Sequence, residues 1–100
     1  MSEQARKEAL RALEQVFPST LATLRDEFDS HEFILKLANR NQRLYVQALA
    51  TYADAVHPFD ALHSQIVRRL IGTGSVKKVR EHNSPDIFRQ VNSSWVLHKQ

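Results

Sequence analysis

Apolar residues recur at spacings of three and four through most of the chain, and this spacing is the period of an amphipathic helix. The first apolar stripe lies in residues 5–17, behind a serine that can cap a helix, and it stops at Pro18. A short second helix is expected over residues 19–28, where apolar residues repeat the same period. The pattern therefore predicts a helical N-terminal region.

The longest helix is predicted from about Ser30 to Ala55. Asp29 and Glu32 stand three residues apart and can form a capping box at its start. An apolar stripe continues from there until Pro58 breaks the helix. At 1.5 Å per residue this helix would span about 39 Å, which is long enough to be the central helix of the domain.

A further helix is predicted over residues 59–71, with apolar side chains on one face and Gly72 as its C-terminal glycine. The basic residues 76–82 that follow fit a short helix or an extended segment almost equally well. Ser84 and Pro85 are typical of a helix start and predict one more helix behind them.

These segments predict an all-α fold, a compact bundle of four to six helices around the long helix of residues 30–55. A chain of 100 residues with 42% hydrophobic and 25% charged residues has the composition of one globular domain. We therefore expect residues 1–100 to form a single helical domain. The residues from about 92 onward contain weak helix formers and are expected as a strand-like or frayed C-terminal arm.

Cysteine is absent, which excludes a disulfide framework and a thiolate metal site and favours a cytoplasmic location. No apolar run approaches the roughly 18 residues of a spanning helix, so no membrane association is predicted. A modest core of this size also leaves room for association into a homo-oligomer.

The charge is distributed unevenly along the chain. Residues 1–60 carry seven Lys and Arg against nine Asp and Glu, a balance of −2, whereas residues 61–100 carry seven against two, a balance of +5. Such a basic segment favours an acidic partner, either a nucleic acid or an acidic protein. The predicted nucleic-acid or anion contacts are Arg68, Arg69, Lys77, Lys78 and Arg80. A helix over residues 76–82 would be too short to read bases, so contact with phosphates is the expected mode.

The segment "GTGSVKK" lacks the spacing of a phosphate-binding loop, and neither a small-molecule substrate nor a cofactor is indicated. None of the five histidines forms an i, i+4 pair, so no metal site is predicted. No nucleophile motif occurs, no catalytic residue is indicated, and we expect a binding protein rather than an enzyme. An enzyme or metal protein centred on His63 and Asp60 is the weakest hypothesis.

The main alternative is a protein–protein interaction module, in particular a homodimer. Asn41 interrupts the apolar stripe of the long helix, a position that can fix the register of a helical interface. Phe88, Val91 and Trp95 form an apolar group near the C-terminus, which either closes the core or meets a partner. The sequence thus predicts a small cytoplasmic binding protein, with nucleic acid as the first candidate partner and a protein as the second.

Overall fold

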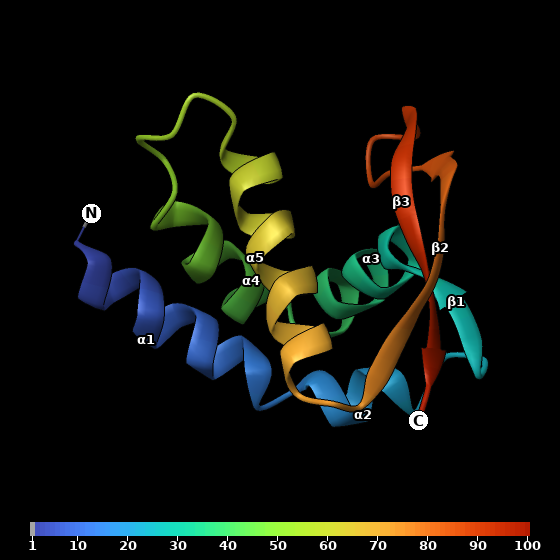
Figure 1. The fold of residues 1–100 in the computed structure, drawn as a ribbon. Helices are drawn as coiled ribbons and strands as arrows, with labels where there is room; N and C mark the ends of the chain where they lie inside the picture. Colours follow the sequence, from blue (N-terminus) through green and yellow to red (C-terminus); the bar gives the residue numbers. More distant parts are fainter. Residues whose placement is uncertain (1) are drawn as a thin grey trace.

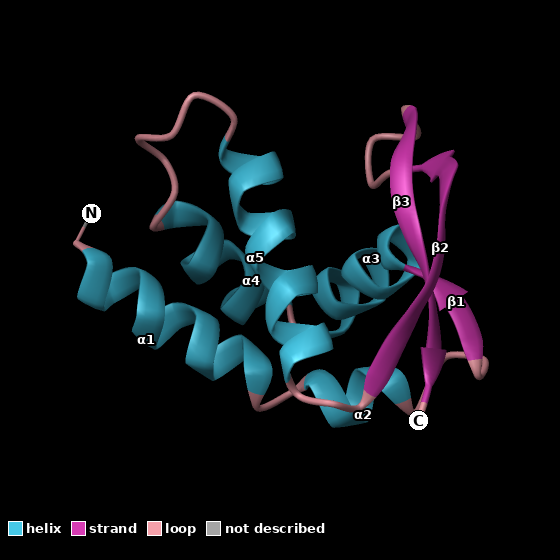
Figure 2. Cartoon of the chain, viewed as in Figure 1, coloured by secondary structure: helices cyan, strands magenta, loops and turns pink. Residues whose placement is uncertain are grey.

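Five helices lie beside a three-stranded antiparallel sheet in the computed structural model, which describes residues 2–100 (Figure 1). The elements follow the order α1 (Glu3–Glu14), α2 (Phe17–Leu21), β1 (Glu27–Asp29), α3 (Ser30–Arg40), α4 (Gln42–Ala50), α5 (Pro58–Gly72), β2 (Val76–Pro85) and β3 (Val91–Lys99). The helices occupy one side of the molecule and the strands the other (Figure 2). The fold is therefore mixed α/β, and the prediction of an all-α helical bundle is wrong.

Two helices, α1 and α3, begin at the capping residues that the sequence signals, whereas α2, α4 and α5 begin without a side-chain cap. The Ser2 side chain accepts a hydrogen bond from the Ala5 N–H at 3.1 Å and caps α1. Asp29 and Glu32 form the predicted capping box of α3, in which the Asp29 carboxylate accepts from the Glu32 N–H at 2.8 Å. These short-range bonds satisfy N–H groups that have no partner inside the helix, so the sequence signal and the structure agree.

The predicted long helix is two helices. Asn41 breaks it between α3 and α4, with backbone angles of φ −137° and ψ 54°. Its side-chain amide donates to the Leu37 carbonyl at 3.1 Å, a carbonyl that also accepts from the Asn41 N–H at 3.0 Å. An asparagine side chain that binds a nearby carbonyl offers the backbone an alternative to the helix. The single central helix of residues 30–55 is therefore a wrong prediction.

The two long strands form a hairpin that replaces the helix predicted after Ser84. Pro85 is the last residue of β2, and residues 86–90 make the turn. The Asp86 carboxylate accepts from the N–H groups of Phe88 at 2.8 Å and Gln90 at 3.0 Å, so it caps a turn rather than a helix. Arg89 adopts a positive φ of 62° in this turn. The open choice for residues 76–82 is resolved as a strand.

The sheet has the order β1-β3-β2, which leaves β2 at one edge. The β2–β3 pairing shifts register between Lys78 and Arg80, as a β-bulge does. The turn before β2 has its left-handed residue at Gly74, with φ 79°, whereas Gly72 is the last residue of α5 rather than its predicted left-handed cap.

The core lies between the helices and the sheet. Phe33 packs edge-on against Phe17 with ring centroids 5.3 Å apart, and Phe28 of β1 lies 6.3 Å from Phe33. Leu37, Leu62, Ile66, Leu70 and Leu97 are fully buried around them. Within residues 2–100, no helix combines the length and the apolar character that crossing a membrane requires.

Candidate functional site

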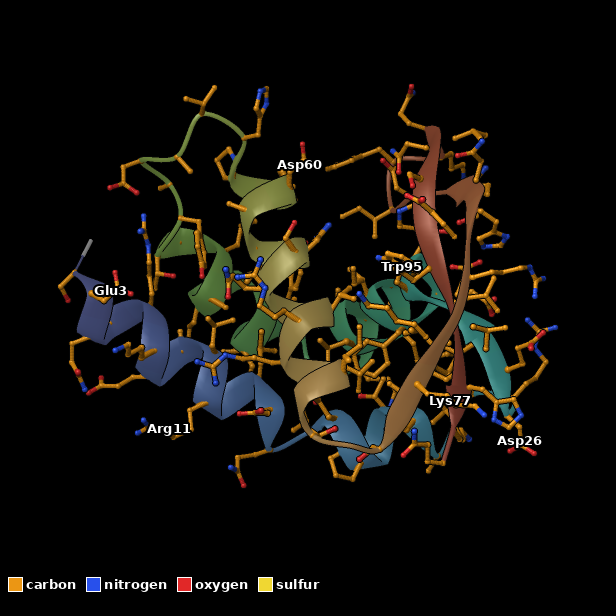
Figure 3. All side chains as sticks on the ribbon, in the orientation of Figure 1. Glu3, Arg11, Asp26, Asp60, Lys77 and Trp95 are labelled. Carbon is orange, nitrogen blue, oxygen red and sulfur yellow. The ribbon has the colours of Figure 1, made fainter. Side chains whose placement is uncertain are left out.

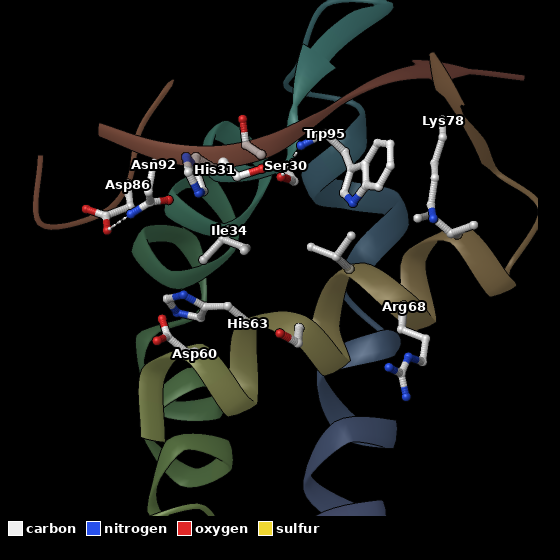
Figure 4. A pocket seen from close by; sticks show the side chains of 15 residues that line it. Ser30, His31, Ile34, Asp60, His63, Arg68, Lys78, Asp86, Asn92 and Trp95 are labelled. Atoms are coloured by element: carbon white, nitrogen blue, oxygen red, sulfur yellow. Dashed lines mark hydrogen bonds between the residues drawn. The ribbon is translucent and has the colours of Figure 1, made fainter. Parts of the chain in front are cut away.

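A cleft of about 620 Å³ separates α5 from the β2–β3 hairpin, with the first turn of α3 at its back (Figure 4). Its volume lies within the range of about 300–1,000 Å³ that is usual for ligand sites. Apolar side chains of α3 and α5 lie in the cleft, and charged and polar side chains stand at its two ends. The apolar ones are Ile34, Val67 and Ile71.

One end of the cleft is basic and aromatic. The Lys78 ammonium group of β2 lies 4.3 Å from the centroid of the Trp95 ring on β3, in a cation–π contact. Arg68 of α5 is exposed at the mouth of the same end, where its guanidinium group points away from Trp95 (Figure 4). Neither cation forms an ion pair with any carboxylate in residues 2–100. This end therefore presents two positive charges and an aromatic ring to solvent.

The other end carries two carboxylates. Asp60 opens the first turn of α5, and Asp86 stands across from it in the hairpin turn (Figure 4). Asp86 also accepts a hydrogen bond from the Asn92 side chain at 2.8 Å. The backbone N–H of Gln90 is the main cause that lowers the pKa of Asp86 below its usual range. Asp60 precedes Arg68 by eight residues, so the two ends are about 12 Å apart along the helix.

His63 faces this acidic end and is held by Tyr45 of α4. The His63 Nε2 atom lies 2.6 Å from the Tyr45 hydroxyl. Burial lowers the pKa of His63 to about 4 and raises the pKa of Tyr45 to about 12. Near pH 7 this hydrogen bond therefore joins a protonated phenol to a neutral imidazole, and neither group carries a charge. An uncharged imidazole ring thus stands beside the carboxylate of Asp60 (Figure 4).

A chain of polar side chains joins α3 to the hairpin and forms the back of the cleft. The His31 Nδ1 atom lies 2.8 Å from the Ser84 hydroxyl, and the Ser84 and Ser94 hydroxyls lie 2.8 Å apart. The Ser30 hydroxyl accepts from the backbone N–H of Trp95 at 3.1 Å. Ser84 and Ser94 are buried, so these bonds satisfy hydroxyl groups that water does not reach. The chain holds the hairpin at a defined distance from α3.

The structure separates the five predicted basic contacts. Arg68 and Lys78 meet at the cleft, whereas Arg69 pairs with Glu14 of α1 at 3.1 Å. Lys77 and Arg80 are exposed and lie opposite His98 and Val96 of β3, while Lys78 lies opposite Leu97. Residues paired across two strands share a sheet face and neighbours along a strand alternate, so Lys77 and Arg80 project from the face opposite Lys78.

The four residues of the predicted protein interface also lie in different places. Phe88 and Val91 are 54% and 70% exposed at the tip of the hairpin, and the Phe88 ring contacts Phe59 edge-on with centroids 4.8 Å apart. Trp95 is half-buried in the cleft, and Asn41 forms the break between α3 and α4.

Sequence reasoning did not select His31, Asp86, Asn92 or Ser94 for the site. They come from α3, the hairpin turn and β3, and they meet because β3 pairs with both β1 and β2. No spacing along the sequence predicts that these residues lie close together. The weak helix formers from about residue 92 onward were the one signal that indicated a strand-like segment there.

The fold and the site define a small α/β protein with a polarised cleft beside a basic β-hairpin. No protein-family model, no curated protein and no solved structure matches this chain. Within residues 2–100, no group of three or more histidine, aspartate or glutamate side chains is arranged to hold a metal ion.

Proposed function

We propose that this protein binds nucleic acid, without catalysing a reaction, through the basic side chains of α5 and β2. The observation that carries the proposal is a set of four exposed cations that form no ion pairs with described residues: Arg68 and Lys78 at the cleft, and Lys77 and Arg80 on the other face of the hairpin. Cations that carboxylates do not neutralise are available to phosphates, which supply most of the sequence-independent affinity for nucleic acids.

The carboxylates of this region do not cancel that charge. Residues 61–100 contain two, Glu81 and Asp86, against seven Lys and Arg. Glu81 accepts a hydrogen bond from the Ser93 hydroxyl at 2.6 Å, and Asp86 is bound within its own turn. Lys78 and Glu81 lie opposite Leu97 and Trp95 and share one face of the hairpin, whereas Lys77 and Arg80 give the other face its positive charge. We place this function in the cytoplasm, in keeping with a chain that contains no cysteine.

The position of β2 at the edge of the sheet gives a competing explanation for its lysines. Lysines on an edge strand also discourage the pairing of one sheet with another, and β2 is such a strand. This role explains charge on β2 but not Arg68 on α5, which stands beside it at the cleft. The two roles make different predictions for binding, so one experiment separates them.

The test measures fluorescence anisotropy of labelled single-stranded and double-stranded DNA and RNA with the purified protein, at about 50 and 200 mM salt. We expect saturable binding that weakens steeply with salt. The double substitution Lys77→Glu with Lys78→Glu should weaken it and lower the slope of log affinity against log salt by about two. Absence of binding at low salt would show that these lysines serve only the edge strand.

The matched control is Lys7→Glu with Arg11→Glu on α1. These residues are exposed, the charge change is identical, and Arg11 lies on the other side of the molecule from Lys77 (Figure 3). The control should bind nearly as well as the unmodified protein. Equal losses in the two double variants would mean that only the net charge matters, and the proposed surface would then be wrong.

The second candidate function is self-association through the hairpin tip. Phe88 and Val91 are the observation that favours it, because both are large, apolar and mostly exposed. Sedimentation equilibrium of the protein and of Phe88→Ser with Val91→Ser tests it. A dimer that dissociates in this variant, but not in Val46→Ser with Val56→Ser on other exposed apolar sites, would support the tip as an interface. A monomer at all concentrations would exclude it.

A further inference from the structure

The cleft is chemically polarised, and its two ends suit the two halves of a nucleotide. Arg68 and Lys78 stand at one end, and Asp60 and Asp86 stand at the other (Figure 4). We propose that the cleft binds one nucleotide of a single-stranded nucleic acid, with a phosphate at the basic end and the base along the apolar floor. This inference rests on the proposed function and names its substrate class.

The phosphate belongs at the basic end because only that end offers unpaired cations. Lys78 is already held there by the Trp95 ring, and its flexible stem lets the ammonium group move from the ring to an incoming phosphate oxygen. The Arg68 side chain is exposed and reaches the same phosphate by rotation about its side-chain torsions. A guanidinium group can then contact two phosphate oxygens at once.

The base belongs on the floor because a nucleobase has apolar faces. Trp95, Val67 and Ile71 line the cleft together, and Ile34 lies between its two ends (Figure 4). Stacking on an aromatic side chain is the usual way in which proteins hold an unpaired base, at about 1–3 kcal/mol per base. The Trp95 indole N–H, which makes no hydrogen bond to the described residues, is an additional donor here.

The acidic end determines where the nucleic-acid backbone leaves the cleft and which type of base the cleft prefers. Phosphates are repelled by Asp60 and Asp86, so the backbone cannot run the length of the cleft and leaves at the Arg68 end. Asp60 accepts no hydrogen bond from the described residues and is free to accept one from an exocyclic amino group. Adenine and cytosine carry such a group on their pairing edge, whereas thymine does not. The cleft should therefore favour adenine and cytosine over thymine.

A single strand is required because the face and the pairing edge of a base are hidden in a duplex. A base must leave the stack before an aromatic side chain and a carboxylate can reach both. The rigid helix and the hydrogen-bonded chain from His31 to Ser94 fix the width of the cleft, so it accepts one strand rather than two.

Trp95 is the only tryptophan of the chain and reports on the cleft directly. The first experiment titrates the protein with oligonucleotides of about ten deoxyadenosines, deoxycytidines or thymidines, and with a duplex, while Trp95 fluorescence and anisotropy of the labelled strand are recorded. We expect quenching that saturates at the same concentration as the anisotropy. The adenine and cytosine strands should bind about tenfold more tightly than thymine.

Two variants sharpen the test. Asp60→Asn should remove most of the preference over thymine and leave the salt dependence unchanged, because the phosphate contacts remain. Asp26→Asn is the matched control, since this exposed carboxylate lies in the loop before β1, away from the cleft (Figure 3). It should keep the preference. A preference lost equally in both variants would overturn the assignment of Asp60.

The outcomes separate this inference from the proposed function. Strand binding with unchanged Trp95 fluorescence, or equal affinity for duplex and single strand, would overturn the cleft assignment and leave the basic surface in place. Absence of binding to every nucleic acid would overturn both. A free adenosine monophosphate that binds as tightly as the adenine strand would show that the cleft takes a soluble nucleotide, and the strand assignment would then be wrong.

Discussion

The helices and the hairpin differ in what they bury. Along α3, the buried side chains are mostly apolar, namely Phe33, Ile34 and Leu37. Along the ten residues of β2, only Val76 and Ser84 are buried, and the rest face solvent at least in part. Apolar burial is the main source of folding free energy, so the helices carry most of the stability. The hairpin carries most of the polar chemistry.

This difference indicates at which residues substitutions leave the protein folded. The hairpin is held by backbone pairing, by a few apolar anchors such as Leu97, and by the buried hydroxyls of Ser84 and Ser94. Among its charged side chains, Asp86 caps the turn and Lys99 donates to the Leu24 carbonyl at 2.6 Å, whereas Lys77 and Arg80 make no such bond to the described residues. Substitutions on the hairpin surface should therefore change binding, whereas substitutions in the helical core should change folding.

The largest expected effect belongs to the helical core. Phe33→Ala removes a ring that contacts both Phe17 and Phe28, and such a cavity costs about 3–5 kcal/mol of unfolding free energy. Leu35→Ala on the same helix should cost much less, since Leu35 is 46% exposed. Urea unfolding followed by circular dichroism measures both. Similar costs would mean that the core is not centred on Phe33.

The starts of α1 and α3 were predictable because their signals are local, whereas the helix expected over residues 19–28 is the shorter α2, Phe17–Leu21. Ser2, Asp29 and Glu32 act on backbone groups within one turn, and each cap is present as expected. The break at Asn41 was missed because the apolar stripe continues across it from Leu37 to Tyr45, although the side chain that causes the break is itself local.

The hairpin was not predictable in the same way. Ser84 and Pro85 carry a helix-start signal, but pairing with β3 competes with it and places both residues in a strand. Of the candidate site, the sequence predicted Arg68 and Lys78 in one basic set and Trp95 in a separate apolar group. Asp60 was named only with His63 in the weakest hypothesis, and Asp86 was missed. The acidic end depends on residues more than twenty positions apart, Asp60 and Asp86, which the fold brings to one cleft. The pattern of residues within one segment of the sequence does not show which distant residues come together.

The next effect concerns His63, a polar group buried on the helical side. Its pKa in the folded protein, about 4, lies below the ordinary value of 6.5, chiefly because of burial; Asp60 and Asp86 raise it and His31 lowers it. The unfolded chain therefore takes up the proton first as the pH falls. The stabilising contribution is complete above pH 6.5 and is lost between pH 6.5 and about 4, by on the order of 3 kcal/mol.

Urea unfolding at several pH values measures this loss. His63→Gln should flatten the curve between these limits relative to the unmodified protein. Tyr45→Phe removes the hydrogen bond but not the burial, so it should lower stability at every pH and keep the slope. If the unfolding free energy of His63→Gln still fell with pH between 6.5 and about 4, another titrating group would be responsible for the loss.

A smaller effect is expected from the polar chain between α3 and the hairpin. Ser84→Ala leaves the Ser94 hydroxyl and the His31 ring without their partner, which should cost about 1–3 kcal/mol. Adding Ser94→Ala should lower the unfolding free energy by little more. The Ser94 hydroxyl has already lost its partner in Ser84→Ala, so its removal breaks no further bond. Thermal unfolding of the single and double variants tests the coupling. Additive losses would show that the two hydroxyls act independently.

The smallest effects compare two neighbouring arginines of α5. Arg69 pairs with Glu14, so Arg69→Ala should lower the unfolding free energy by up to about 1 kcal/mol and leave nucleic-acid binding nearly unchanged. Arg68 has no carboxylate partner among the described residues, so Arg68→Ala should weaken binding and reduce its salt slope by about one, with no measurable change in stability. Anisotropy measures nucleic-acid binding and urea unfolding measures stability for each of the two variants. If Arg69→Ala weakened binding as much as Arg68→Ala, the basic surface would extend beyond the cleft end of α5, and the division between supporting helices and binding hairpin would no longer hold for this helix.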